Sequence, residues 1–431
     1  MKKYIRLSLS IFSIFFGITF LGSCVKDTCK QTYTYSYYIP VYKTTNEVKA
    51  GIKSGAPQEV ENPGKIVLLG DYIFLNDVDK GIHVIDNRNP AMPRNAAFIS
   101  IPGNMDLALK GNTLYADLYT DLVTLDISDP LNVVVKKYDE GVFPFRAYGN
   151  GFYNDSTKII TDWVKRDTTV TQNCTAGQLY YDYYGGAVPQ TFYTNYSSAS
   201  STGSTMNSTS PIGKGGSMAR FTIAGNILYT VSNTDLNVFN ITNPGNPVYD
   251  SKINISAWNV ETIFPFKDKL LIGTQNGMFV YDTKNPDKPT LAGQFSHVQS
   301  CDPVIADGDY AYVTLRTGTT CAGNTNALQI LKLNNYTDPQ LLQSYTLTNP
   351  HGLSKDGKLL FVCDGIDGLK IYNASDINNL QLVKQFADME AYDVIAYNYL
   401  ALVVSKDGLY QFDYSNENNI RPISKIGIAN Q

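Results

Sequence analysis

Short stretches of alternating apolar and polar residues, each followed by turn-forming residues, recur along the chain. Near-copies of one pattern are GIHVIDNRNPAMP (81–93), DLVTLDISDPLN (121–132), DLNVFNITNPGNP (235–247) and GMFVYDTKNPDKP (277–289). Successive copies end at Pro90, Pro130, Pro244, Pro286, Pro339, Ile377 and Glu417, which are 40, 114, 42, 53, 38 and 40 positions apart. A period near 40 with strand-type spacing predicts the four-stranded blades of a β-propeller rather than a helical solenoid.

The four strands of one blade are visible in residues 302–347. DPVIADGDYAYVTL (302–315) predicts two strands joined by an Asp-Gly turn, ALQILKL (327–333) a third strand, and QLLQSYTL (340–347) a fourth. The same order predicts complete blades at 65–101, 105–138, 218–255, 260–295, 352–386 and 392–426. Seven complete antiparallel blades are therefore expected.

The interval of 114 residues predicts a further, degenerate blade. Residues 142–170 open like residues 263–274 and contain a second strand pattern at 158–163. A tract rich in Tyr, Ser, Thr and Gly follows at 171–216, with too few aliphatic residues to form a core, and is expected to be a surface insertion. We therefore predict an all-β propeller over residues 60–431 with eight blades, one of them degenerate. A seven-bladed ring with a decorated loop is the alternative.

The repeated acid before each turn is interpreted as a structural residue. In Asp126-Ile127-Ser128-Asp129-Pro130, the side chain of Asp126 can accept hydrogen bonds from backbone amides ahead of it, while Pro130 fixes φ and ends the strand. Asp86, Asn240 and Asp282 occupy the same place in other repeats. These side chains are predicted to build turns rather than to bind ligands.

The start of the chain predicts export and a lipid anchor. Lys2, Lys3 and Arg6 precede an apolar run at 7–21, which has the layout of a secretory signal. The run ends in LGSC (21–24), which resembles the bacterial lipobox, and this resemblance implies cleavage before Cys24 and acylation of that residue. We expect a signal peptide at 1–24, a tether at 25–59 and an outer-membrane lipoprotein facing either the periplasm or the medium. Val25 stands where some lipoproteins retained at an inner membrane carry aspartate.

The charge of the chain excludes one class of partner. Residues 1–24 hold three of the 35 basic residues and none of the 39 acidic ones, so the remainder has a net charge of about −7. Nucleic acids and anionic lipid surfaces are bound through basic patches, and neither is expected here.

The repeat itself resembles a known family. Strands reading IHVID, LVTLD and MFVYD before an Asp-Pro or Asn-Pro turn are similar to the LVIVD repeat of bacterial and archaeal surface proteins. The resemblance covers about 60–428, is strongest at 64–135 and 300–375, and is lost in the 171–216 tract. It implies a β-propeller at the cell surface and no established activity or catalytic motif.

Charged residues are predicted to gather at one end of the channel, where the innermost strands begin. The positions are Asp106, Arg220, Glu261, Asp302, His351 and Asp393, with Arg146 nearby. Such a ring could hold a cation, a sugar or a peptide end. The loops NDVDKG (76–81) and CDGIDG (363–368) contain pieces of calcium loops without the closing glutamate, so no cofactor is expected beyond a weak calcium site.

The cysteines predict one disulfide. Cys301 enters an inner strand and Cys321 lies in the long loop of the same blade, so both are expected on one face in an oxidising compartment. Cys363, one blade along, is the rival partner.

Two functions are compatible with these patterns. The first is a non-enzymatic binding or scaffold module for a glycan or a protein, attached to the membrane through Cys24. The alternative is a polysaccharide hydrolase or lyase that uses Asp302, Asp393 and His351 as acid and base. The chain has no HExxH, GxSxG or phosphate-loop motif, which favours the first.

Overall fold

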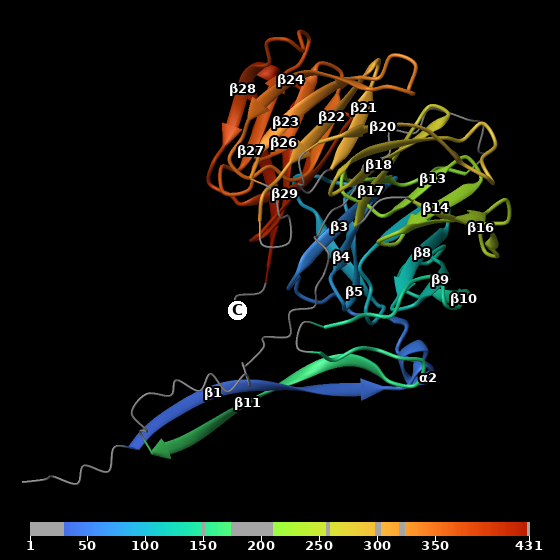
Figure 1. The fold of residues 1–431 in the computed structure, drawn as a ribbon, viewed down its shortest axis with the longest axis vertical. Helices are drawn as coiled ribbons and strands as arrows, with labels where there is room; N and C mark the ends of the chain where they lie inside the picture. The colour runs from blue at the N-terminus through green and yellow to red at the C-terminus, as the bar shows by residue number, and fades with distance from the viewer. Residues whose placement is uncertain are drawn as a thin grey trace, which may run out of the picture. The chain divides into compact units, whose positions relative to one another are not determined.

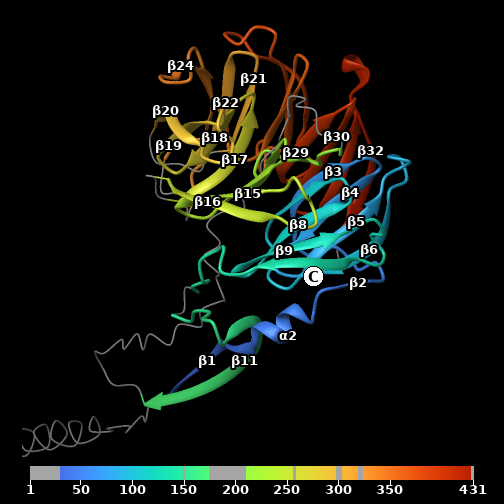
Figure 2. The same cartoon turned by 90° about the vertical axis from the view of Figure 1, so that its right-hand side faces the viewer.

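The computed structural model describes residues 30–148, 151–173, 210–255, 259–297, 303–318 and 324–428. Over these residues the chain forms seven four-stranded antiparallel blades and one additional two-stranded sheet (Figures 1 and 2). The predicted all-β propeller is confirmed. The blade count is seven, which was the alternative, and the preferred count of eight is wrong.

Each blade is a meander in which consecutive strands pair. Blades 1 and 2 comprise β3 (Pro63–Leu69), β4 (Tyr72–Asp77), β5 (Gly81–Asp86), β6 (Arg94–Ser100), and β7 (Leu107–Lys110), β8 (Thr113–Leu118), β9 (Asp121–Asp126), β10 (Val134–Asp139). Blades 3 and 4 comprise β13 (Phe221–Ala224), β14 (Ile227–Val231), β15 (Asp235–Asn240), β16 (Val248–Asn254), and β17 (Val260–Phe266), β18 (Lys269–Thr274), β19 (Gly277–Asp282), β20 (Thr290–Ser296). Blade 5 comprises β21 (Val304–Asp307), β22 (Tyr310–Leu315), β23 (Ala327–Lys332) and β24 (Gln340–Thr346). Blades 6 and 7 comprise β25 (Leu353–Asp356), β26 (Leu359–Cys363), β27 (Leu369–Asn373), β28 (Gln381–Phe386), and β29 (Ala391–Tyr397), β30 (Leu400–Ser405), β31 (Gly408–Asp413), β32 (Arg421–Gly427).

The ring closes where blade 7 meets blade 1, and no blade combines strands from both ends of the chain. β3 lies beside β30, and Val60 forms a parallel bridge with Ile428. The hydroxyl of Ser424 donates to the carbonyl of Pro90 at 2.7 Å across the same junction. Two short elements extend blade 1: β2 (Lys53–Gly55) pairs with its outer strand β6, and β12 (Lys214–Gly215) pairs with its inner strand β3.

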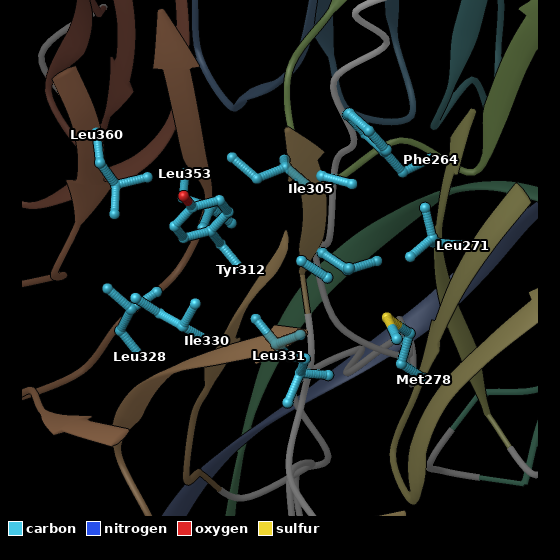
Figure 3. Packing of buried hydrophobic residues seen from close by; sticks show 14 of the residues in the cluster. Phe264, Leu271, Met278, Ile305, Tyr312, Leu328, Ile330, Leu331, Leu353 and Leu360 are labelled. Carbon is cyan, nitrogen blue, oxygen red and sulfur yellow. The ribbon is translucent and has the colours of Figure 1, made fainter. Parts of the chain in front are cut away.

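The hydrophobic core lies between the faces of neighbouring blades. Figure 3 shows one such region, in which Phe264 and Leu271 of blade 4, Tyr312 of blade 5, and Leu353 and Leu360 of blade 6 belong to one cluster. All five side chains are at most 1% exposed. The first three strands of a blade are therefore mostly buried on both faces, as in β5 and β18, whereas the fourth strand has only half-buried and exposed positions in β20 and β24.

The repeated turns have the predicted local structure. Backbone amides two residues ahead donate to the side-chain oxygens of Asp86, Asp126, Asn240 and Asp282 at 2.8–3.2 Å. This confirms that these residues are turn builders, because each satisfies a backbone donor that the strand ladder leaves free.

The strand predicted for an eighth blade belongs to a different sheet. β11 (Ile159–Asn173) pairs with β1 (Lys30–Lys43), and threonine hydroxyls face each other across the pair at 3.1 Å (Thr32 and Thr171) and 3.0 Å (Thr34 and Thr169). Most of this sheet forms one compact unit and the propeller forms another. Residues 142–148 and 151–158 form no blade, and two of their large apolar side chains are exposed: Phe145 is 54% and Tyr153 67% exposed.

The described residues contain one α-helix and one 3-10 helix. The α-helix α2 (Thr45–Lys49) has a capping box between Thr44 and Glu47 and buries Val48 against blades 1 and 2. The 3-10 helix η1 (Glu417–Asn419) replaces the proline turn in blade 7. Neither of these two helices of the described ranges is long and apolar enough to cross a membrane.

Candidate functional site

Residues 210–218, the channel segment, run along the inner strands of the propeller. β12 pairs with β3 of blade 1, and the amide of Gly213 donates to the carbonyl of Leu109 in blade 2 at 2.9 Å. Lys214 Nζ donates to the carbonyl of Ala396 in blade 7 at 3.1 Å. The segment therefore contacts the innermost strands of three blades from inside the ring.

The channel segment includes the end of the tract that was expected at the surface. Residues 174–209 lie outside the described part of the chain, but 210–216 lie against inner strands. Glycines permit this close approach: a Cβ at Gly213 would lie 2.6 Å from Val67, and a Cβ at Gly216 would lie 1.9 Å from Asp393 Oδ2. Sequence composition indicated only a polar, glycine-rich loop and gave no sign of this position.

Charged side chains of alternating sign lie on successive blades, and we call them the axial ring. Five lie at or just before the start of a first strand, and Arg316 lies just after the second strand of blade 5. Taken in the order of blades 7, 1, 2, 3, 4 and 5, they are Asp393, Lys65, Asp106, Arg220, Glu261 and Arg316. Lys65 interacts electrostatically with Asp106 and Asp393, Arg220 with Asp106 and Glu261, and Arg316 with Glu261. His351 of blade 6 lies within the field of Arg316.

The structure places the predicted residues unevenly. Asp106, Arg220, Glu261, His351 and Asp393 all belong to this region. Asp302, Cys301, Cys321 and Cys24 lie outside the described residues, and Cys363 is a buried free thiol in β26. Sequence reasoning missed Lys65 and Arg316. Lys65 could have been found because it is the first residue of its repeat, as Asp106 and Arg220 are near the start of theirs.

Lys65 and Asp106 form a buried ion pair. Lys65 Nζ is 3.8 Å from Asp106 Oδ2 and donates to the carbonyl of Met218 at 3.0 Å. Burial, against the opposing charge of Asp106, lowers the pKa of Lys65 to about 8. Burial likewise raises the pKa of Asp106 to about 6, although Lys65 and the amides of Arg220 and Leu107 favour its charged form.

Asp393 is enclosed by the channel segment. Its Oδ1 accepts from the amide of Ser217 at 3.1 Å and from the hydroxyl of the same residue at 3.3 Å. Its Oδ2 is buried and has no hydrogen-bond partner among the described residues. Burial raises the pKa of Asp393 to about 7. A protonated carboxyl is therefore well populated at neutral pH.

His351 is a buried, neutral side chain. It is 8% exposed, its Nε2 lies 3.3 Å from Asn349 Nδ2, and its ring centroid lies 5.3 Å from that of Tyr392. Burial, and then the charge of Arg316, hold the pKa of His351 well below its ordinary value. A protonated imidazole is disfavoured in this position.

A cavity of about 330 Å³ lies beside the axial ring at the junction of blades 2 and 3, and we call it the lateral pocket. Its apolar walls include Tyr119, Phe143, Phe145 and Phe221. The rings of Phe143 and Phe221 stack at 5.5 Å, and the amide of Phe143 donates to the carbonyl of Thr120 at 2.8 Å. Residues 142–147, which follow β10, thus form one wall of the pocket rather than a blade.

Two guanidinium groups line the lateral pocket and differ in their partners. Arg146 contacts Asp79 Oδ1 at 2.5 Å, the carbonyl of Gly103 and the ring of Tyr119. Its partners raise the pKa of Arg146 above its ordinary value despite burial. Arg220 donates through Nη2 to Asn233 Oδ1 at 3.1 Å, and no carboxylate of the described residues lies within salt-bridge distance of its guanidinium.

Acids that end the second strands hold the chain that enters the first strands. Asp77 accepts from the amides of Glu61 and Asn62, Asp117 from Met105 and Asp106, and Asp364 from Thr348 and Asn349, at 2.7–3.2 Å. Asp77 and Asp364 are the first acids of the calcium-like loops NDVDKG and CDGIDG. Among the described residues, no group of three or more His, Cys, Asp or Glu side chains is arranged to hold a metal ion.

Comparison with known proteins supports the fold. The LVIVD repeat model matches residues 63–96 and 103–138, which correspond to blades 1 and 2. A search of curated proteins gave no significant match. A protein from Lactobacillus plantarum aligns with a TM-score of 0.51 at 12% identity, over 85% of this chain and 96% of that one.

A second solved structure is similar to the same degree. The periplasmic gluconolactonase PpgL of Pseudomonas aeruginosa aligns with a TM-score of 0.50 at 12% identity, over 85% of this chain and 96% of that one. At such identities the likeness concerns the fold alone. The chain therefore carries LVIVD repeats in its first two blades and, over the residues described, folds as a seven-bladed β-propeller.

Proposed function

We propose that the protein is a lipid-anchored, outer-membrane β-propeller that binds a glycan or a protein partner and has no catalytic role. The observation that carries this proposal is the lateral pocket, an apolar cavity of about 330 Å³ with aromatic walls at the end of the channel where the inner strands begin. Its volume lies at the lower end of the range for small-molecule sites, and a few polar groups among apolar walls are typical of such sites. The acylation of Cys24 would attach this pocket to the membrane.

A polysaccharide hydrolase or lyase has less support. Two of its three expected acid–base residues are described: Asp393 is covered by Ser217 and the backbone of Gly216, and His351 is 8% exposed. A general acid must reach the bond that it protonates, and neither side chain has an open approach. The likeness to a gluconolactonase is limited to the fold, so we propose no lactonase activity for this chain.

Binding by the purified, acylated protein in detergent tests the proposal. Immobilised protein would be probed with a glycan array and with crosslinked envelope extract, in the wild-type form and as Phe145→Ala. Phe145 lines the lateral pocket and is 54% exposed, so its removal is expected to weaken binding at least several-fold without unfolding the protein. Tyr399→Ala, an aromatic side chain 64% exposed on blade 7, is the matched control.

Retention of a ligand by the control and its loss by Phe145→Ala would support the pocket as the binding site. Equal binding by both variants would show that the ligand binds outside the lateral pocket. Turnover of a polysaccharide panel by the wild-type protein, with or without calcium, would contradict the non-enzymatic proposal.

A further inference from the structure

The geometry points to a ligand class for the lateral pocket: a carboxylate joined to an apolar group, with Arg220 as its counter-ion. This inference rests on the proposed binding function and specifies its chemistry. It follows from which hydrogen-bonding groups of the pocket are already occupied and which remain open.

The acids that line the pocket are occupied. Asp117 Oδ1 accepts three hydrogen bonds, from Asn104 Nδ2 and the amides of Met105 and Asp106, at 2.8–2.9 Å. Asp106 accepts from the amides of Leu107 at 2.8 Å and Arg220 at 2.6 Å, and its Oδ2 faces Lys65. Neither carboxylate is positioned to receive a cationic ligand, and two guanidinium groups in the walls would repel one.

Arg220 has unused hydrogen-bonding capacity. A guanidinium carries five N–H donors. One bond from Nη2 to Asn233 is formed, and Nε is buried without a hydrogen-bond partner among the described residues. The partner that Asp106 offers is taken by the backbone amide of Arg220 rather than by its guanidinium. An unpaired buried N–H is energetically costly, so a ligand that accepts further hydrogen bonds from this guanidinium is favoured.

The burial of the Arg220 guanidinium also favours an anionic ligand. Burial lowers the pKa of Arg220, against the attraction of Asp106, Asp117 and Glu261. A bound carboxylate would compensate the desolvated charge and could accept two parallel N–H donors. Arg146 cannot take this role, because Asp79 and Gly103 already occupy its guanidinium.

The remaining walls select for an apolar body. Tyr119, Phe143, Phe145, Phe221 and Val231 line the same pocket as Arg220 and offer aromatic and aliphatic surface. A neutral sugar would need a hydrogen-bond partner for each hydroxyl that it buries, and its burial would be costly here. An aromatic or branched aliphatic carboxylic acid, or the C-terminal residue of a polypeptide with such a side chain, matches both features.

Titration calorimetry with small carboxylates tests the inference on the full-length protein in detergent. The probes are N-acetyl-L-phenylalanine, its C-terminal amide, and 3-phenylpropionate. We expect the amide to bind at least tenfold more weakly than the acid, because it cannot pair with the guanidinium. Tenfold tighter binding of N-acetyl-L-phenylalanine than of 3-phenylpropionate would identify a polypeptide C-terminus as the ligand, and equal binding would identify a free acid.

Variants of Arg220 supply the second arm. Arg220→Gln should weaken binding of the acid at least tenfold and remove the preference over the amide, whereas Arg220→Lys should keep part of it. Arg421→Gln, an arginine 55% exposed in its side chain and paired with Asp413 on blade 7, is the matched control. Far-ultraviolet circular dichroism and thermal unfolding establish that each variant is folded, and the comparison of acid with amide on the wild type needs no variant.

The inference would be overturned by equal affinity for acid and amide, or by Arg220→Gln binding the acid as the wild type does. If none of the carboxylates binds while Phe145→Ala still abolishes capture of a glycan or an envelope protein, the ligand class is wrong and the proposed binding function stands. If Phe145→Ala also has no effect on any ligand, both fail.

Discussion

Asp393 illustrates how a single residue depends on its surroundings in this protein. In sequence it is an acid near the start of a strand, but in the fold it is 1% exposed and lies beneath Gly216 and Ser217. Its carboxyl has a pKa raised to about 7, and its Oδ2 is unpaired among the described residues. The group is thus a source of pH-dependent stability.

Folding stability should fall as pH rises through the range set by Asp393. Since the pKa is about 7 in the folded protein and about 3.9 in an unfolded chain, the folded state binds more protons between these values, and raising the pH there favours unfolding. Asp393→Asn removes this dependence and should be stabilised relative to wild type at pH 8 by on the order of 2–4 kcal/mol, with little difference at pH 4. Urea unfolding at pH 4, 6 and 8 measures both.

The pH dependence of stability that Asp126 causes has the opposite sign, and Asp126→Asn tests it. Hydrogen bonds from Ser128 and Lys136 lower the pKa of Asp126 to about 2, so its contribution to stability is present above about pH 4 and is lost as pH falls toward 2. Asp393→Asn and Asp126→Asn should therefore change the pH profile in different ranges. Identical pH profiles for wild type and Asp393→Asn would show that the buried carboxyl does not titrate as inferred.

At the scale of elements, the repeated turn joins blades as well as strands. The carbonyl of Pro244 accepts from the hydroxyl of Tyr115 in the preceding blade at 2.8 Å, and the carbonyl of Pro286 accepts from Tyr229 at 2.7 Å. Ile377 accepts from Tyr345 at 2.7 Å in the same way. The turn that ends a third strand is therefore also a contact between adjacent blades, which explains why it recurs with the blade period.

Removing one of these hydroxyls should lower stability measurably. Tyr115→Phe leaves the ring in place but leaves the carbonyl of Pro244 without this donor, at a cost of about 1 kcal/mol. Tyr229→Phe should cost a similar amount, and the two effects should add, because the bonds lie at different blade junctions. Tyr397→Phe, on a side chain 44% exposed, is the control for urea unfolding. A loss equal to that of the control would mean that the hydroxyl bonds are not stabilising.

The position of the channel segment requires a glycine at residue 216, because the backbone there lies close to Asp393. A Cβ on residue 216 would lie 1.9 Å from Asp393 Oδ2, so Gly216→Ala should destabilise the protein by on the order of 1–3 kcal/mol. Gly427→Ala meets no atom within 4 Å and should change the free energy of unfolding by at most about 0.5 kcal/mol. Combining Gly216→Ala with Asp393→Ala should cost less than the sum of the two, since the clash is shared. Strict additivity would contradict this placement of the segment.

At the scale of the whole molecule, the ring is a sum of similar blade junctions. Blades 4, 5 and 6 share one continuous cluster, and blades 1 and 7 share another that includes Ile73 and Leu402. Closure therefore uses the same apolar packing as every other junction. The lateral pocket lies at one of these junctions, between blades 2 and 3, and residues 143–147 form part of its lining.

Membrane attachment of the whole molecule through Cys24 is a prediction, and one substitution tests it. Cys24→Ser removes the thiol that the lipobox-like LGSC would present for acylation. We expect the wild-type protein to fractionate with the outer membrane and to incorporate labelled palmitate, and the variant to lose both. Membrane fractionation of the variant with no incorporation of label would contradict the lipid anchor.

The sequence by itself determined the all-β class, the positions of seven blades and the role of the turn acids. These follow from two-residue apolar alternation and from Asx–Pro turns, which act over a few residues and so are visible in a linear pattern. Asp126 and Asp282 needed no tertiary information, because their partners lie two residues away.

Only the tertiary structure decided the blade count, the contents of the channel and the pocket. β11 has a strand pattern, but it pairs with β1 and is not part of the ring. The paired residues are 131–139 positions apart in the chain. Ser217 reaches Asp393 across 176 residues, and Arg220 remains open because the backbone amide of the same residue takes the carboxylate of Asp106. Such contacts join groups that only the folded chain brings together, and no local sequence pattern specifies them.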